Sequence, residues 1–410
     1  MTSRERILAA IEHREPDQVP VDLGATPSTG ISAVAYGRLK QHLEIRGGHT
    51  RIYDVVQQVA QPEEAILDRF DIDVLDIGRT FNRRDADWHD TTLLDGQAAQ
   101  YPAGFHPELQ PDGSRIVRQT SGVEIARMPA RGWFFDQTCF PWAGGYPEDM
   151  DGLDEAMGKV PWAALAISPW DHAGEPEFWA ALRERTHVLG RGSNRALMVG
   201  CGCNLFEWGT FIRRLDNFLA DLVIDPVNVE RFLDALLERH LAFLEKVCAA
   251  VGDAADVVRF GDDLGADGGP FMSPATYRRF FKPRHAQLCA CVRRNSRMKT
   301  YLHSCGSVYR LMPDLIEAGF DVINPVQTSS RDMEPERLKR EFGKDICFWG
   351  GGCDTQRILN LGTPAEVRDH VRRRIDIFAP GGGFVFAAIH NILPEVPPEN
   401  VVAMFDALRC

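Results

Sequence analysis

Residues 300–306 read Thr-Tyr-Leu-His-Ser-Cys-Gly, a short apolar run that ends in His303 and Cys305 before a glycine. A run of this kind is typical of a buried β-strand, in which side chains two positions apart lie on the same face. His303 and Cys305 would therefore project together from one rigid element. Imidazole and thiolate are ligands that Zn²⁺ prefers, so the pair predicts half of a metal site at a strand end. The alternative is that both are ordinary residues at the end of a strand.

The chain around this strand alternates apolar strand-like runs with amphipathic helical stretches, which is the pattern of a parallel sheet. The expected strands are residues 19–23, 72–77, 196–201, 256–260, 299–304, 321–326, 346–350 and 383–389. The clearest expected helices are residues 227–250, 274–293 and 363–378, the last with Thr363 as its cap and Glu366 at its third position. Eight strand and helix units predict an α/β fold of the (β/α)₈ class, a TIM barrel.

The long interval at residues 82–195, between the second and third expected strands, is not a simple strand-to-helix connection. It contains a predicted β-hairpin that turns at Ser121 and Gly122. An aromatic-rich stretch follows, which we expect to pack on the barrel and to form a lid or one wall of a pocket: Trp133, Phe134, Phe135, Phe140, Trp142 and Tyr146. We expect residues 1–410 to form a single barrel domain with this stretch as an insertion.

Composition narrows the classes of function. The net charge is −12, and an acidic chain is a poor partner for nucleic acid. No apolar segment is long enough to predict a membrane span. The first residues lack an apolar signal core, and Thr2 with Glu5 predicts a helix capping box instead, so we expect a cytoplasmic protein. The 10 cysteines are too sparse for a disulfide framework and are interpreted as buried thiols, metal ligands or reactive thiols.

Polar residues follow most of the later expected strands, at the end of a barrel where active sites form. They are Asp262 and Asp263, His303 and Cys305, Gln327, Cys353, and His390 and Asn391. Ligands from neighbouring strands would leave a metal with an open position for catalysis. Two adjacent acids in a strand point to opposite faces, so at most one of Asp262 and Asp263 should face the metal, and the other should cap a helix or anchor hydrogen bonds.

Several motifs, spread in order along nearly the whole chain, resemble those of the uroporphyrinogen decarboxylase superfamily. They are D-x-V-P-V at residues 17–21, G-D-D-L-G at 261–265, Y-x-x-F-x-K-P-R at 277–284, H-S-C-G at 303–306, G-G-C-D-T-Q at 351–356 and H-N-I-x-x-x-V-P-P-E-N at 390–400. The resemblance implies a distorted barrel that is often a homodimer. The decarboxylase branch carries arginines after the first strand to hold the substrate carboxylates, whereas residues 22–30 contain none here.

The chain therefore resembles the other branch, the zinc-dependent methyltransferases that work with a corrinoid. That branch implies zinc ligation by His303, Cys305 and a third residue, for which Cys353 is ranked before His390. Asp262, Asp263 and Glu207 are the expected catalytic acids or further ligands. We expect Gln327 and Asn391 to bind substrate. No D-x-H-x-x-G signature of a cobalamin-binding domain is found, so the corrinoid would arrive on a separate protein.

Three functions follow from this reading. The first is a zinc and corrinoid methyltransferase that demethylates a methoxylated or methylated small molecule, or moves a methyl group from methylcobamide to an acceptor. The second is a decarboxylase or lyase acting on a small carboxylated substrate. The third is a non-catalytic metal-binding scaffold. The sequence leaves the substrate and the direction of transfer open.

Overall fold

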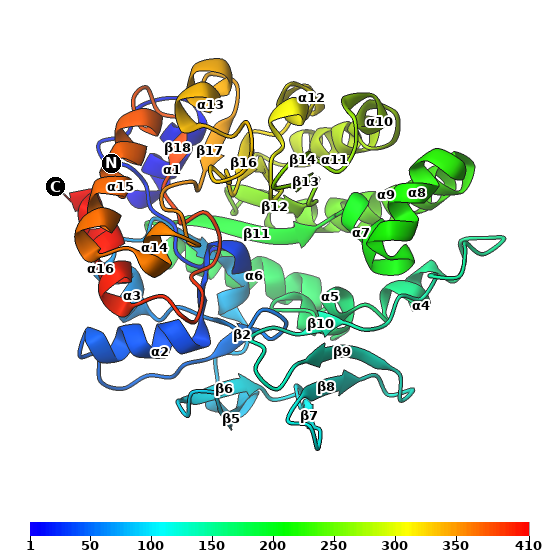
Figure 1. Ribbon diagram of the computed structural model, residues 1–410, viewed down its shortest axis with the longest axis horizontal. Coiled ribbons are helices and arrows are strands. Elements are labelled where there is room, and N and C mark those ends of the chain that lie inside the picture. The colour runs from blue at the N-terminus through cyan, green and yellow to red at the C-terminus, as the bar shows by residue number, and fades with distance from the viewer. Residues whose placement is uncertain (410) are drawn as a thin grey trace.

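Seven parallel strands form the central sheet of the computed structural model, which describes residues 1–409 (Figure 1). In spatial order they are β18 (Phe384–Val385), β17 (Cys347–Trp349), β16 (Val322–Asn324), β15 (Lys299–His303), β12 (Val257–Gly261), β11 (Ala196–Gly202) and β4 (Val74–Asp76). Neighbours in this order follow one another along the chain, with helices in most of the connections, as in a TIM barrel. The predicted α/β fold class is confirmed.

The first expected strand, residues 19–23, is wrong as a strand. Val21 makes a single parallel bridge with Phe386, just beyond β18. Its carbonyl accepts a 2.8 Å hydrogen bond from the N–H of Asp73, just before β4, and its own N–H donates to the Asp73 carboxylate. Pro20 has no N–H to give to a ladder. The eighth position is therefore a short irregular segment, which still joins the two edges of the sheet and closes the ring.

Helices cover the outside of the sheet, and their sequences explain most of their bounds. The predicted helix at 227–250 is α9 (Pro226–Val251), whose leucine stripe is buried against the sheet. The predicted helix at 274–293 is instead two helices, α10 (Pro274–Phe280) and α11 (Lys282–Asn295). Pro283 sits in the first turn of α11, where a missing N–H is tolerated, so a new helix begins there.

Two capping boxes predicted from sequence are confirmed. Thr2 and Glu5 cap α1 (Ser3–Ile11), and Thr363 and Glu366 cap α15 (Pro364–Phe378). The remaining helices are α2 (Ala33–His42), α3 (Glu64–Arg69), α4 (Leu153–Met157), α5 (Pro161–Ala164), α6 (Phe178–Gly192), α7 (Phe206–Arg213), α8 (Leu215–Ile224), α12 (Met312–Ala318), α13 (Pro335–Phe342), α14 (Ile358–Leu361) and α16 (Pro398–Asp406). No helix within residues 1–409 is both long and apolar enough to cross a membrane.

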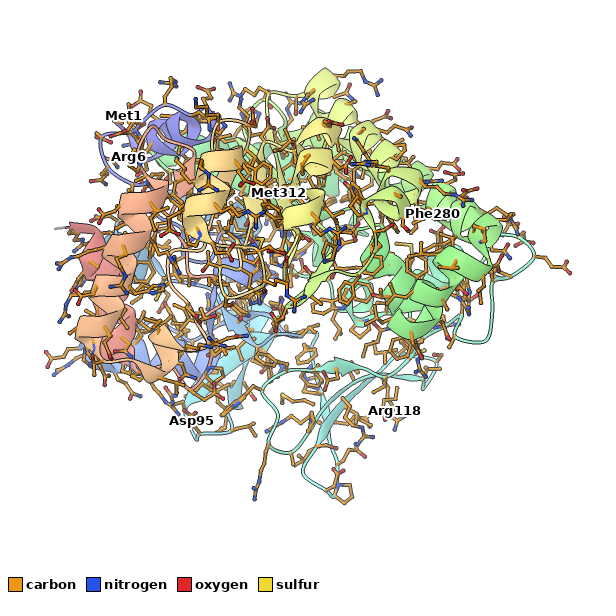
Figure 2. The ribbon with its side chains drawn as sticks, turned by 45° about the horizontal axis from the view of Figure 1, so that its top comes forward. Met1, Arg6, Asp95, Arg118, Phe280 and Met312 are labelled. Atoms are coloured by element: carbon orange, nitrogen blue, oxygen red, sulfur yellow. The ribbon has the colours of Figure 1, made fainter. Side chains whose placement is uncertain are left out.

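The insertion between β4 and β11 contains most of the antiparallel structure. The predicted hairpin is confirmed as β8 (Arg115–Arg118) and β9 (Glu124–Met128), within a four-stranded sheet. The other short strands are β1 (Ile31–Ser32), β2 (Ile52–Asp54), β3 (Val59–Ala60), β5 (Trp88–Thr92), β6 (Ala98–Pro102), β7 (Glu108–Leu109), β10 (Asp136–Gln137), β13 (Gly265–Ala266) and β14 (Gly269–Pro270). In Figure 2, Asp95 and Arg118 mark this insertion at the lower side of the molecule, opposite Met1 and Met312.

The interior of the barrel is filled by inward-facing side chains from all seven strands of the sheet. Val257, Tyr301 and Trp349 belong to one buried cluster that also contains Ile7 and Ile11 of α1. The N-terminal helix therefore closes one end of the barrel with apolar side chains. Two residues further along each strand, the same inward face reaches the open end, where the polar residues lie.

Candidate metal centre

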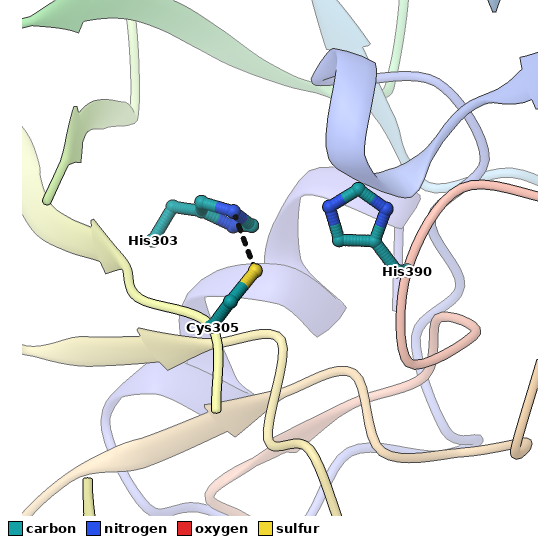
Figure 3. Close-up of side chains that lie close together, drawn as sticks. All are labelled: His303, Cys305 and His390. Atoms are coloured by element: carbon teal, nitrogen blue, oxygen red, sulfur yellow. Dashed lines mark hydrogen bonds between the residues drawn. The ribbon is translucent and has the colours of Figure 1, made fainter. Parts of the chain in front are cut away.

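His303, Cys305 and His390 meet at the open end of the barrel (Figure 3). His303 ends β15, Cys305 lies two residues beyond, and His390 follows β18. One donor atom from each side chain lies within 4.8 Å of the others, and His303 Nε2 is 3.4 Å from Cys305 Sγ. Ligand atoms of a tetrahedral zinc are about 3.3–3.8 Å apart. The His303–Cys305 separation already fits, and a small movement of His390 would complete three protein ligands with a fourth position open.

The third residue of this group is His390 and not Cys353, which was ranked first from the sequence. Cys353 pairs through its backbone with Ala388 and is fully buried in the outer apolar core. The charges that act on its thiol are those of Asp354 and Arg374, the latter on α15 outside the sheet. Among residues 1–409, the structure does not bring Cys353 together with His303 and Cys305.

Hydrogen bonds preset the protonated nitrogen of both imidazoles. His303 Nδ1 lies 2.6 Å from Asn324 Oδ1, and the Asn324 amide donates to the Trp349 carbonyl at 2.8 Å. Because the amide nitrogen is committed to Trp349, its oxygen must accept from His303. His390 Nδ1 lies 2.9 Å from Asn391 Oδ1 in the same way. Both Nε2 atoms are thereby left unprotonated, and that of His303 accepts from the Cys305 thiol. A hydrogen bond of this kind to Nδ1 is the usual orienting contact behind a metal-ligating histidine.

Burial sets the protonation of the three candidate ligands. It lowers the pKa of His303 to about 4 and also lowers the pKa of His390, so both rings are neutral at neutral pH. Burial, followed by the charge of Asp263, raises the pKa of the Cys305 thiol well above its usual value. A metal ion must displace that proton in order to bind sulfur, which couples binding to proton release. The donor set suits a divalent ion such as zinc.

Replacing Asn324 by leucine is expected to weaken zinc binding by about 10- to 100-fold, because His303 loses the acceptor that fixes its tautomer and ring orientation. Competition against a chromophoric chelator measures this affinity. Asn324→Asp keeps an acceptor oxygen and should retain most of it. Unchanged affinity in the leucine variant would show that Asn324 does not orient the ligand.

The adjacent acids Asp262 and Asp263 have different surroundings. Asp262 is fully buried and accepts from the N–H groups of Leu205, Phe206 and Glu207, which open α7, and from His285. Asp263 is half-exposed, its Oδ1 lies 3.7 Å from His303 Nε2, and it accepts from the Cys305 N–H at 2.8 Å. Asp263 therefore borders the candidate metal centre, and Asp262 supports the helix behind it.

Glu207, in the first turn of α7, is a second carboxyl group near the centre. Its side chain accepts a short hydrogen bond from the amide of Asn204. Burial, with the negative charges of Asp263 and Asp262, raises its pKa well above the usual value for glutamate. Its charge in turn helps to raise the pKa of Cys305. A carboxyl group with a raised pKa keeps its proton to higher pH and can donate it during a reaction.

The two expected substrate-binding residues use their polar atoms within the protein. Gln327 accepts from the Gly306 N–H and donates to Asp267, both at 2.9 Å. Asn391 contacts His390 and donates to Gln57 at 3.3 Å. These contacts position the loop that carries Cys305 and the ring of His390, and substrate binding by either amide stays a prediction.

A cavity of about 530 Å³ lies between the barrel and the insertion. Tyr53 and Asp76 line it on the barrel side, and rings of Phe81, Trp88, Phe105 and Trp170 line much of the rest. Burial raises the pKa of Asp76 to about 7. The rings expected to form this wall lie elsewhere: Trp142 and Tyr146 pack against Phe232 of α9, and Trp133 borders a separate, smaller cavity. The rings of Trp142 and Tyr146 therefore stabilise the packing of the insertion.

The sequence of this chain is similar to that of a known protein family. A sequence model described as "Uroporphyrinogen decarboxylase (URO-D)" matches residues 203–410, about half of the chain and the part that holds the candidate centre. The chain belongs to the uroporphyrinogen decarboxylase family. The relatives of this chain include methyltransferases and decarboxylases. Membership of the family alone therefore does not decide between these two activities.

Curated relatives of both activities match this URO-D family chain. The methylcobamide:CoM methyltransferase MtaA of Methanosarcina barkeri is 28% identical over 182 residues, 43% of this chain and 48% of that protein. The uroporphyrinogen decarboxylase of Syntrophotalea carbinolica is 24% identical over 184 residues, 45% of this chain and 49% of that protein. The matches thus span about half the length of these relatives. Both relatives are enzymes.

A solved structure described as a methyltransferase from Methanosarcina mazei has the same fold. It superposes on 100% of this chain and 98% of its own with a TM-score of 0.59, at 17% sequence identity. At this identity the likeness bears on architecture only. It supports the TIM-barrel-like arrangement of the family member described here.

Two important residues were not assigned a site role from the sequence. Asn324 lies within the expected strand at residues 321–326, but its contact with His303 depends on the register between β15 and β16. Arg259 stands within the apolar run Val257-Val258-Arg259-Phe260, and a charged residue inside a buried strand is itself a signal of function.

Proposed function

We propose that this chain is a zinc-dependent methyltransferase that works with a corrinoid protein. The observation that carries the proposal is the group of His303, Cys305 and His390, with neutral imidazoles whose Nε2 atoms are directed to ligation by Asn324 and Asn391. The similarity to a methylcobamide:CoM methyltransferase supports the same reaction class. The absence of arginine from residues 22–30 weighs against the porphyrinogen substrate of the decarboxylases.

In this proposal His303, Cys305 and His390 hold the zinc. Bound zinc would supply Lewis-acid stabilisation of a leaving alkoxide, phenolate or thiolate, or would lower the pKa of an acceptor thiol. The residues of the chain do the rest by positioning and proton control. Glu207 holds a proton that it can donate to a departing group, and Asp263 keeps the Cys305 loop in place through its N–H.

The substrate would be a methoxylated or methylated small molecule that gives up its methyl group to cobalt, or an acceptor that receives methyl from methylcobamide. The corrinoid would be carried by a separate protein. A homodimer and a cytoplasmic location, inferred from the resemblance and the sequence, also stay predictions.

The test uses the purified full-length chain. Elemental analysis should find about one zinc per chain. Methyl transfer is then followed by the cobalamin absorbance, with free methylcobalamin and a thiol in one direction, and with cob(I)alamin and an aryl methyl ether in the other. Turnover that survives complete removal of zinc would refute the proposal. Release of carbon dioxide from a small acid without any corrinoid would favour the decarboxylase or lyase alternative, and zinc without either activity the scaffold alternative.

Replacing Glu207 by glutamine is expected to lower the rate of demethylation by about 100- to 10,000-fold. Its carboxyl group donates only while protonated, so the wild-type rate should fall as pH rises through its raised pKa. The glutamine variant should lose this alkaline limb of the pH profile. Glu238→Gln, at an exposed position on α9, is the matched control and should change neither rate nor profile. An unchanged profile in the Glu207 variant would remove the proton-donor role.

A further inference from the structure

Two buried polar atoms on barrel strands and one on β2 have no hydrogen-bond partner: Arg259 Nε, Tyr301 Oη and Tyr53 Oη. Arg259 lies on β12 two residues after Val257, whose side chain belongs to the interior cluster, while Val258 and Phe260 belong to the outer core. Side chains alternate along a strand, so Arg259 projects into the barrel. Its direct neighbour across the sheet is Tyr301 on β15.

Arg259 has no counter-ion. Within residues 1–409, its guanidinium makes no hydrogen bond to protein and no ion pair within 4.0 Å. Arg213, by comparison, is held by two bonds of 2.8 and 3.1 Å to Asp221. A buried cation without a partner is costly, and such a group is normally paired. Arg259 is only half-buried as a whole, so part of the guanidinium faces the open barrel.

The acids near Arg259 are engaged elsewhere. Asp54 accepts from the N–H groups of Val56 and Gln57 and from the Gln57 side chain, at 2.9–3.0 Å. Glu207 accepts from Asn204. Arg259 nevertheless lies near enough to both for its charge to lower the pKa of each carboxyl. Neither acid forms a hydrogen bond or an ion pair with Arg259.

The two tyrosines complete a set of donors. Tyr301 lies directly across the sheet from Arg259, and the positive charge of Arg259 acts to lower the pKa of both Tyr53 and Tyr301 against the larger effect of burial. Tyr53 also lines the cavity of about 530 Å³ with its aromatic walls. A guanidinium without a partner and two tyrosine hydroxyl groups that can donate match the needs of a carboxylate, and the ring-lined cavity matches an apolar body attached to it.

We propose that Arg259, with Tyr53 and Tyr301, binds the carboxylate of a small apolar substrate in the barrel mouth beside the candidate metal centre. Arg259 pairs with Tyr301 in the register of β12 and β15, and two residues further along the same strands Gly261 pairs with His303, so the bound acid would lie next to the centre. The relevance to catalysis rests on the proposed methyltransferase function. Binding of the acid does not rest on that function, because none of Arg259, Tyr53 and Tyr301 is a candidate zinc ligand.

The test measures binding by calorimetry to the full-length protein after metal removal. The probes are benzoate, 4-methoxybenzoate and hexanoate, each compared with its uncharged amide. At least one acid should bind more tightly than its amide, and Arg259→Met should weaken that acid by about 10- to 100-fold, as expected for loss of a charge-assisted hydrogen-bonded pair. Tyr53→Phe and Tyr301→Phe should each weaken it by a few-fold.

Thermal stability distinguishes a binding residue from a structural one. Since Arg259 has no partner to lose, Arg259→Met should keep or raise the melting temperature of the ligand-free protein. Arg213→Met is the matched control and should lower it, because Asp221 would be left unpaired. The proposal is overturned if no acid binds more tightly than its amide, if Arg259→Met binds the acid as well as wild type, or if that variant loses stability as Arg213→Met does.

The two proposals fail separately. Absence of zinc or of methyl transfer would leave the metal-free binding experiment unchanged. Zinc-dependent methyl transfer at equal rates from charged and uncharged substrates would refute the carboxylate site alone.

Discussion

Replacing Cys305 by alanine is expected to reduce the zinc content of the purified protein from about one ion per chain to trace levels and to abolish methyl transfer. The centre offers three protein ligands, and two imidazoles alone hold zinc far more weakly than two imidazoles with a thiolate. His303→Ala and His390→Ala should have the same result. Elemental analysis after exhaustive dialysis, together with the cobalamin absorbance assay, measures both effects.

Cys353→Ala is the matched control for this prediction. It removes a thiol from the following strand end, but Cys353 is packed in the outer core and belongs to no metal-binding group in the described chain. The variant should keep its zinc and its activity, with a modest loss of stability from the missing buried atom. Loss of zinc from Cys353→Ala with retention in His390→Ala would reverse the assignment of the third ligand.

Replacing Asp262 by alanine is expected to lower the free energy of unfolding by about 3–5 kcal/mol. Three backbone N–H groups at the start of α7 and the ring of His285 all lose their acceptor, in a position shielded from water. Glu207 lies in the same turn, so catalysis should fall as well. Urea unfolding measures the stability.

The neighbouring acid gives the comparison. Asp263→Ala removes a side chain that is 37% exposed and accepts one backbone N–H, so its stability should change by less than about 1.5 kcal/mol. Equal losses in the two variants would contradict the separate roles of the two acids. A tolerant Asp262 variant would show that α7 does not depend on this carboxylate.

Local sequence patterns predicted most of the fold because strands and helices in a parallel α/β protein are defined by short-range periodicity. The capping boxes and the hairpin at Ser121 and Gly122 followed from local chemistry. The errors arose where neighbours decided the outcome. Residues 19–23 have the composition of a strand, but Pro20 and the contact of Val21 with Asp73 leave only a bridge.

The candidate site divides in the same way. His303 and Cys305 could be paired from their spacing in one strand. The choice of His390 over Cys353 depended on which face of the sheet each side chain takes beyond its strand, which spacing in the chain does not reveal. Asn324 and Tyr301 lie beside their partners through lateral register, and a single sequence carries no record of it.

The N-terminal helix determines from which end reactants can enter the barrel. Ile7 and Ile11 fill the end beneath the strands, and the N–H of Gly383, at the start of β18, donates to Ala10 of this helix. This end of the barrel is closed, so a small molecule and the bulky corrinoid of the proposed function would both have to enter from the open end. The small reactant would then have to bind before the corrinoid docks over it. Kinetics that show random-order binding would contradict this sequence.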